Sequence, residues 1–153
     1  MIGAGKTCMT ASGELQFLDT DILVYAHDIS AGAKHIKAVE LVQGCWELQT
    51  GCTSLQVLEE FYLAVTGKVS RPLDEGTAAG ILRDLSYWRV HTPRPGDLLN
   101  AIDLQEQYNL AFRDAMIVQS AAGLGCEVIW SEGISPDGVY AGVKVINPFR
   151  SKS

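Results

Sequence analysis

Three acidic residues lie in or beside apolar segments, where a carboxylate is unusual. Asp19 ends a short apolar stretch, Glu60 lies within an apolar segment, and Asp114 opens another one. Burying a carboxylate is costly unless it is paired or bound to an ion. Mg²⁺ and Mn²⁺ take oxygen ligands from such scattered carboxylates, and bound ions of this kind can activate water for phosphodiester cleavage. Taken together, the three acids indicate a metal-dependent hydrolytic site.

Each of these acids also has a purely structural explanation. Asp19 is a favoured N-cap for a helix that follows it. Glu60, beside Glu59, can be a solvated charge, because Glu is rarely buried, although helical spacing slightly favours Glu60 facing inward. Asp114 in the first turn of a helix is stabilised by the helix dipole. The residue types alone leave both explanations open.

The elements that must position these acids alternate along the chain. Apolar periodicity and capping residues predict a strand that runs into a turn over 16–25, and further strands at 52–55, 89–91, 128–130 and 144–146. The same signals predict helices at 33–49, 54–67, 74–87, 97–108 and 112–124. Such alternation predicts an α/β three-layer sandwich, with a central, mostly parallel sheet flanked by helices. Sites in open sheets form at the carboxyl ends of strands, which points to Asp19 and to the segment after Trp130.

Length and composition fit one domain. The chain has 153 residues, 47% of them apolar and 20% charged. We assign residues 16–150 to the domain and residues 1–15, which are polar and rich in glycine, to a flexible leader. No apolar run of about 18 residues or signal peptide is present, so we expect a cytoplasmic protein with no membrane partner. The four cysteines form no C-x-x-C pair and the three histidines lack zinc spacing, so we expect reduced thiols.

The net charge of −6 argues against bulk binding of nucleic acid, which normally shows a basic footprint. It does not argue against a nuclease, because carboxylates that hold a metal are themselves a source of negative charge. The ion and a few basic residues would then reverse the charge locally. Arg113, Lys68 and Arg71 are the candidates for RNA contacts, with ordinary surface positions as the alternative.

Four stretches of the chain resemble, in order, the motif blocks of PIN domains, and in particular those of VapC-type ribonuclease toxins. They read FLDTDILVYAHD, SLQVLEEFY, FRDAMIVQSA and IWSEGIS, and the resemblance covers roughly residues 16–149. It implies a PIN-like fold and a metal-dependent endoribonuclease, the toxin of a toxin–antitoxin pair. The implied cofactor is Mg²⁺ or Mn²⁺, and the implied partners are an RNA substrate, a cognate antitoxin and a second copy of the chain as a homodimer.

The resemblance also implies roles for individual residues. By motif position, Asp19, Glu60 and Asp114 match the first three acids that bind metal and catalyse in the family. Ser54 matches a small hydroxyl residue at the second block, and Asp21 falls where the family often has Asn. Asp21 and Ser54 are therefore auxiliary candidates.

The fourth block departs from the family pattern. Where the family has its fourth acid, this chain reads Ser131, Glu132 and Gly133, with Gly133 in the place of the acid. Ser131 and Glu132 are further auxiliary candidates, and Asp137 is another acid that could reach the site. Because glycine offers no ligand, the alternative function is a catalytically impaired PIN-like scaffold that binds RNA or a protein partner.

Two other motif resemblances lack residues that their families require. The G-A-G-K-T of residues 3–7 lacks the first glycine of a P-loop and no strand precedes it. The D-T-D of residues 19–21 resembles the aspartyl nucleophile of haloacid-dehalogenase-like phosphatases, but Leu23 stands where that family has Thr or Val, and no paired acidic motif follows.

Overall fold

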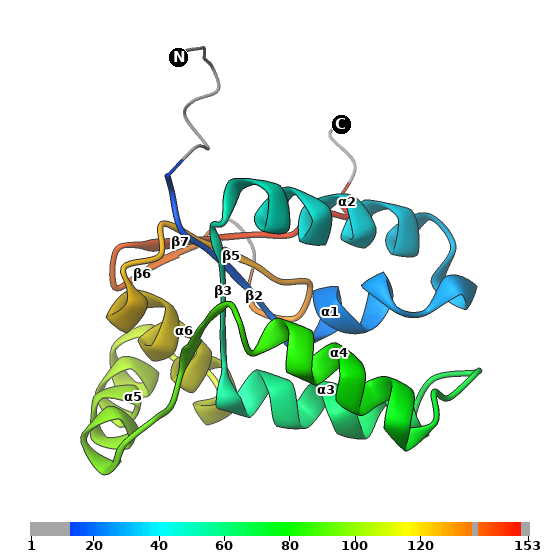
Figure 1. The fold of residues 1–153 in the computed structure, drawn as a ribbon. Helices are drawn as coiled ribbons and strands as arrows, with labels where there is room; N and C mark the ends of the chain where they lie inside the picture. Colours follow the sequence, from blue (N-terminus) through cyan, green and yellow to red (C-terminus); the bar gives the residue numbers. More distant parts are fainter. Residues whose placement is uncertain (1–12, 136–137, 151–153) are drawn as a thin grey trace.

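A sheet of six strands forms the centre of the computed structural model, which describes residues 13–135 and 138–150 (Figure 1). Its strands stand in the order β4-β3-β2-β5-β7-β6. All neighbours pair in parallel except β6 and β7, which are antiparallel. The strands are β2 (Gln16–Leu18), β3 (Gly51–Ser54), β4 (Arg89–His91), β5 (Val128–Trp130), β6 (Val139–Tyr140) and β7 (Val143–Ile146).

Within the described ranges six α-helices flank the sheet, which confirms the predicted three-layer α/β class. They are α1 (Thr20–Ala26), α2 (Ala33–Leu48), α3 (Leu55–Gly67), α4 (Glu75–Leu85), α5 (Pro95–Tyr108) and α6 (Phe112–Leu124), with a 3₁₀ turn, η1, at Ile29–Ala31. The chain moves from β2 through β3 to β4 with α1–α4 as the connections, then returns to β5 through α5 and α6. Right-handed crossovers in opposite directions along one sheet place their helices on opposite faces. Figure 1 shows α5 and α6 as a separate pair, apart from α1–α4.

The core lies between the sheet and both helix layers. Phe17 at the centre of β2 is fully buried and pairs with Cys52 on one side and Ile129 on the other. Phe61 of α3 and Ile117 of α6 are also fully buried. Because all parallel strands end at the same edge, this packing brings Asp19, Ser54 and the turn after Trp130 to one side of the molecule.

The structure corrects several predicted boundaries. The segment after Asp19 is a helix, α1, and the helix expected at 97–108 already begins at Pro95. In α5, Asp97 occupies the third helical position, and its Oδ2 accepts the Arg94 backbone N–H at 2.8 Å. Strand β6 was not predicted, because two residues carry no readable alternation.

The expected leader falls mostly outside the described residues, since residues 1–12 and also Asp137 are not among them. The described part of the leader contacts the fold, because the Leu15 carbonyl accepts the Glu127 N–H at 3.0 Å. In the described ranges, no helix has the length and apolar character needed to cross a membrane.

Candidate active site

Asp19 is the most buried acid at the carboxyl edge of the sheet. It directly follows β2 and caps α1, where its Oδ1 accepts the Thr20 N–H at 2.7 Å. Only 1% of Asp19 is exposed, and its Oδ2 accepts a hydrogen bond from the Ser131 hydroxyl at 2.8 Å. Asp19 therefore caps α1 and also contacts the turn after β5.

Glu60 reaches the same place from α3. Ser54 caps this helix by accepting the Val57 N–H at 3.3 Å, so α3 begins at the carboxyl end of β3. The Glu60 carboxylate lies less than two turns further on and accepts the Thr20 hydroxyl at 2.6 Å. The structure thus places Glu60, rather than Glu59, on the side of the helix that faces Asp19.

Arg113 joins the three acids. Its Nη2 donates to Asp19 Oδ1 at 2.7 Å and to Glu60 Oε1 at 2.6 Å. Its Nη1 lies 3.2 Å from Asp114 Oδ1, and Nη2 also donates to the Thr20 hydroxyl at 3.0 Å. The three acids matched to the family therefore converge, and the group on which they converge is a guanidinium of the same chain.

Electrostatic contacts favour the charged forms of Arg113 and Glu60. Burial disfavours the Arg113 cation, but the hydrogen bonds and charges of Asp19 and Glu60 outweigh it and raise the Arg113 pKa. Burial also disfavours the charged form of Glu60 and alone would raise its pKa. Hydrogen bonds from Arg113 and Thr20 outweigh burial and lower the Glu60 pKa overall. Three carboxylates against one guanidinium leave a formal charge of −2, so the cluster still favours positive charge.

Asp21 contacts the turn that follows β5, next to the acidic cluster. Its Oδ2 accepts the backbone N–H groups of Glu132 at 2.9 Å and Gly133 at 3.1 Å. Its Oδ1 is buried and has no hydrogen-bond partner among the residues that the structure describes. Desolvation and, secondly, the charge of Asp19 raise the pKa of Asp21 to about 7. A Cβ built on Gly133 would lie 3.8 Å from Asp21 Oδ2, so Asp21 occupies the neighbourhood of the missing fourth acid.

Glu132 points to a different set of partners. It accepts the Tyr25 hydroxyl at 2.6 Å and forms an ion pair with Lys34. Burial would raise its pKa, but the hydrogen bonds from Lys34 and Tyr25 lower it. Glu132 therefore ties the turn after β5 to α1 and α2, and its carboxylate is engaged away from the Arg113 cluster.

Lys68 and Arg71 lie beyond the far end of α3. Lys68 is the C-cap of that helix and both residues are exposed. Eight residues separate Glu60 from Lys68, which is about 12 Å along a helix axis. The structure does not bring these two cations to the acidic cluster, so any contact they make with RNA would be peripheral.

Two polar residues at the site were not singled out from the sequence. Thr20 donates to Glu60, and Gln56 Nε2 lies 3.4 Å from both Glu60 Oε2 and the Arg113 carbonyl oxygen. The signal for Thr20 was its place between two acids at a helix start, and the signal for Gln56 was its i, i+4 spacing from Glu60.

The donor chemistry of the cluster fits a hard divalent cation. All candidate ligands are carboxylate oxygens, with the Thr20 and Ser131 hydroxyls beside them. As they stand, no three acidic, histidine or cysteine side chains of the described residues are grouped as a metal site. The Arg113 guanidinium lies among the three carboxylates and contacts each of them.

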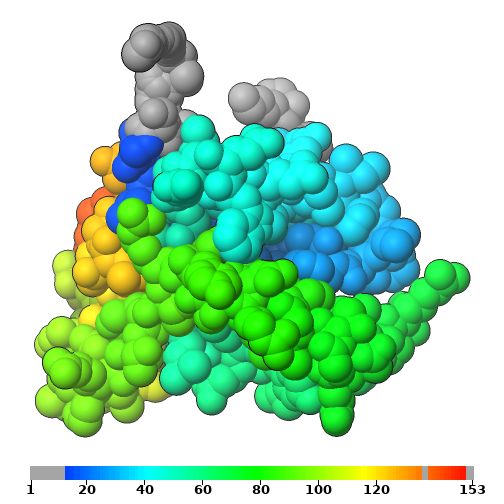
Figure 2. Space-filling model, in the orientation of Figure 1, coloured from blue at the N-terminus to red at the C-terminus, as the bar shows by residue number. Residues whose placement is uncertain are grey.

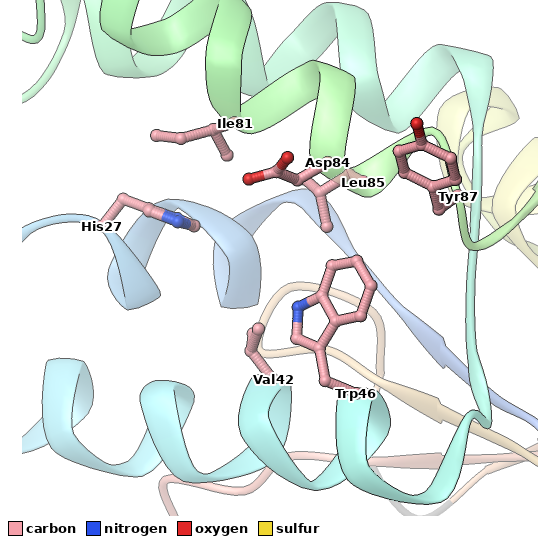
Figure 3. A pocket seen from close by; sticks show the side chains of 7 residues that line it. All are labelled: His27, Val42, Trp46, Ile81, Asp84, Leu85 and Tyr87. Atoms are coloured by element: carbon pink, nitrogen blue, oxygen red, sulfur yellow. The ribbon is translucent and has the colours of Figure 1, made fainter.

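A separate cleft of about 390 Å³ lies between α2 and α4. On the face in Figure 2 these helices border a hollow, with α1 seen between them. Figure 3 shows Val42 and Trp46 of α2 facing the α4 side chains across this cleft, with His27 at its side. None of the acids that converge on Arg113 lines it, so the cleft is not part of the acidic cluster.

Comparison with known proteins identifies the family of the chain. The sequence matches the PIN domain family over residues 17–134, and the chain belongs to that family. The matched span contains Asp19, Glu60, Arg113 and Asp114. A comparison with curated proteins finds no significant match.

Solved structures with the same fold include toxins of toxin–antitoxin systems. VapC20 of Mycobacterium tuberculosis, a sarcin–ricin loop cleaving toxin, is 16% identical with a TM-score of 0.57, over 76% of this chain and 88% of that one. A toxin–antitoxin complex from Klebsiella pneumoniae is 16% identical with a TM-score of 0.63, over 89% and 99%. FitAcB from Neisseria gonorrhoeae is 15% identical with a TM-score of 0.58, over 90% and 100%. At these identities the similarity establishes the fold.

Proposed function

We propose that this PIN-domain chain is a Mg²⁺- or Mn²⁺-dependent endoribonuclease that cleaves RNA phosphodiester bonds. The observation that carries the proposal is the convergence of the Asp19, Glu60 and Asp114 carboxylates at the carboxyl edge of the sheet. These are the catalytic and metal-binding candidates, and a bound ion would supply an activated water and charge stabilisation at the phosphate.

The remaining side chains orient these ligands. Ser131 donates to Asp19 and Thr20 donates to Glu60, so one oxygen of each carboxylate has a fixed hydrogen-bond direction. Asp21 holds the turn that carries Ser131, and Ser54 fixes the start of α3. Arg113 is the cation best placed to contact a phosphate.

The proposed biological setting is a toxin–antitoxin pair in the cytoplasm. The support is that a similar structure was solved as a toxin–antitoxin complex. The excess negative charge of the acidic cluster favours a basic segment in the antitoxin that covers it. A homodimer remains a prediction, which light scattering coupled to size exclusion would test.

Asp114→Asn is the most direct test of the proposal. We expect it to lower metal-dependent cleavage of a mixed RNA pool by about 10²-fold or more, because a charged ligand becomes a neutral one. Asp103→Asn on the exposed side of α5 is the matched control and should cleave like the native chain. Full activity of Asp114→Asn would refute the proposed chemistry.

Gly133 supports the alternative of a scaffold without activity, because the fourth acid is absent and Arg113 occupies the centre. In that case the native chain would bind RNA or a protein partner and leave the RNA pool uncut at every concentration of Mg²⁺ or Mn²⁺.

A further inference from the structure

Arg113, in the first turn of α6, uses all of its side-chain nitrogens in hydrogen bonds. Its three nitrogens donate to Asp19, Glu60, Asp114 and the Thr20 hydroxyl. Its contacts to Asp19 use both carboxylate oxygens, at 3.2 and 2.7 Å. This geometry is what a cation at the focus of three carboxylates would adopt, whether that cation is an ion or a guanidinium.

The helix itself does not favour this position. Arg113 is the second residue of α6, and a cation in the first turn faces the positive end of the helix dipole. The acids therefore hold the guanidinium in place, while Asp114 next to it is favoured by the same dipole. A divalent ion carries twice the charge of the guanidinium, so an ion in the place of Arg113 would change the formal charge of the three-carboxylate cluster from −2 to −1.

We propose that Arg113 is a resident counter-cation of the acidic cluster, which a divalent ion must displace in order to bind. This inference rests on the proposed metal-dependent function and adds a regulatory step to it. In the metal-free protein Arg113 keeps the three mutually repelling carboxylates together. Metal and guanidinium then compete for the same oxygens. The apparent metal affinity equals the intrinsic affinity multiplied by the fraction of molecules in which Arg113 has already left the carboxylates.

The Arg113 side chain can move from the carboxylates toward solvent. The Arg113 side chain is 36% exposed, so its path to solvent is open at one side of the cluster. Its backbone stays fixed in α6, which keeps the guanidinium beside the centre. A guanidinium there can bind a phosphate bidentately, so metal loading would free a phosphate-binding group at the place where RNA arrives.

The sign of a change in metal affinity tests the proposal. We expect Arg113→Gln to bind Mn²⁺ at least about tenfold more tightly than the native chain, measured by calorimetry or by the spin resonance of free Mn²⁺. Arg83→Gln, at an exposed arginine in the last turn of α4, changes the net charge equally and should leave the affinity unchanged. A merely structural Arg113 would give the opposite sign, because its removal would splay the ligands and weaken metal binding.

A second measurement uses the native chain and does not depend on the variant folding. In the metal-free protein, the Arg113 Nε–H should give a protected side-chain NMR signal, because it donates to both Glu60 oxygens at 3.2 Å. Titration with diamagnetic Mg²⁺ should abolish that protection as the guanidinium leaves. Retention of the protected signal at saturating Mg²⁺ would overturn the proposal.

The outcomes separate this inference from the proposed function. If the native chain binds Mn²⁺ and cleaves RNA, but Arg113→Gln binds Mn²⁺ equally or more weakly, the displacement step is wrong and the nuclease stands. If neither form binds Mn²⁺ or Mg²⁺, both the displacement and the metal-dependent nuclease are refuted.

Discussion

At the scale of single residues, the structure separates acids that the sequence treated alike. Asp19 is almost fully buried and has hydrogen bonds from Thr20, Ser131 and Arg113. Asp114 is partly exposed and has one contact to Arg113 at 3.2 Å. Repulsion between the two charges in the absence of an ion would predict that neutral variants of both acids are no less stable. The pairing with Arg113 changes that expectation for Asp19.

Asp19→Asn should lower the free energy of unfolding of the metal-free protein by about 2 kcal/mol, because a buried, charge-paired acceptor is lost. Asp114→Asn should change it by less than about 0.5 kcal/mol, because little pairing is lost and repulsion is relieved. Urea unfolding in chelator would measure both. Equal effects of the two substitutions would show that Asp19 does not anchor the cluster.

Gly133 provides the second residue-scale prediction. Among the described residues, a Cβ there meets only Asp21, at 3.8 Å, which leaves room for an aspartate. Under the proposed function, Gly133→Asp adds a charged ligand and should lower the Mn²⁺ concentration needed for half-maximal cleavage several-fold. The new charge beside Asp21 should also cost about 1 kcal/mol of stability in metal-free buffer.

Gly133→Asn is the size-matched control for that experiment. It should lack both effects, because it brings no charge. If the native chain is an inert scaffold, Gly133→Asp should instead create or greatly raise cleavage. Identical metal dependence in all three forms would mean that position 133 does not face the metal, and that the fourth motif block is misaligned.

At the scale of elements, the turn after β5 is held by a charged clamp. Glu132 connects it to Tyr25 of α1 and Lys34 of α2, while Tyr25 packs edge-on against Phe149 at 5.2 Å between ring centroids. The same turn carries Ser131, which orients Asp19. The clamp therefore links helix packing to the geometry of the acidic cluster.

Glu132→Gln should lower stability at neutral pH by about 1 kcal/mol, since it removes a partly buried ion pair. The folded-state pKa of Glu132 is lowered. The contribution is therefore complete above its unfolded pKa and disappears as the pH falls through the folded pKa. Unfolding curves from pH 7 to 3 should show the difference between native and variant protein shrinking toward zero. Glu47→Gln, at an exposed acid of α2, is the control, and an undiminished difference at pH 3 would contradict the clamp.

The elements themselves could largely be predicted from the sequence. Helix caps such as Ser54 and Asp74, with apolar periodicity between them, depend on local chemistry, and the structure has both caps. Motif position brought Asp19, Glu60 and Asp114 together as candidates. The place of Arg113 could not be predicted, because its partner Asp19 is 94 positions away and nothing local directs the side chain inward. The role of Glu132 was hidden for the same reason, since Lys34 is 98 positions away.

At the scale of the whole molecule, the net charge of −6 means that any added salt should stabilise the fold a little by screening self-repulsion. A specific metal centre predicts more than screening. At a Mn²⁺ concentration of about 100 times its dissociation constant, binding to the folded state adds about 2.7 kcal/mol. For a domain of this size that corresponds to a rise in Tm of roughly 5–10 °C.

The decisive measurement is the Tm of the native chain in Mn²⁺ and in NaCl at equal ionic strength, obtained by calorimetry or fluorescence. The native chain should show the larger rise in Tm only with Mn²⁺, and excess chelator should reverse it. Asp114→Asn should show the small rise expected from screening in both salts, because its centre has lost a charged ligand while the rest of the surface keeps its charge. If the native chain melts at the same temperature in the two salts, the acids around Arg113 form a structural ion-pair network, and the divalent ion has no specific place in this molecule.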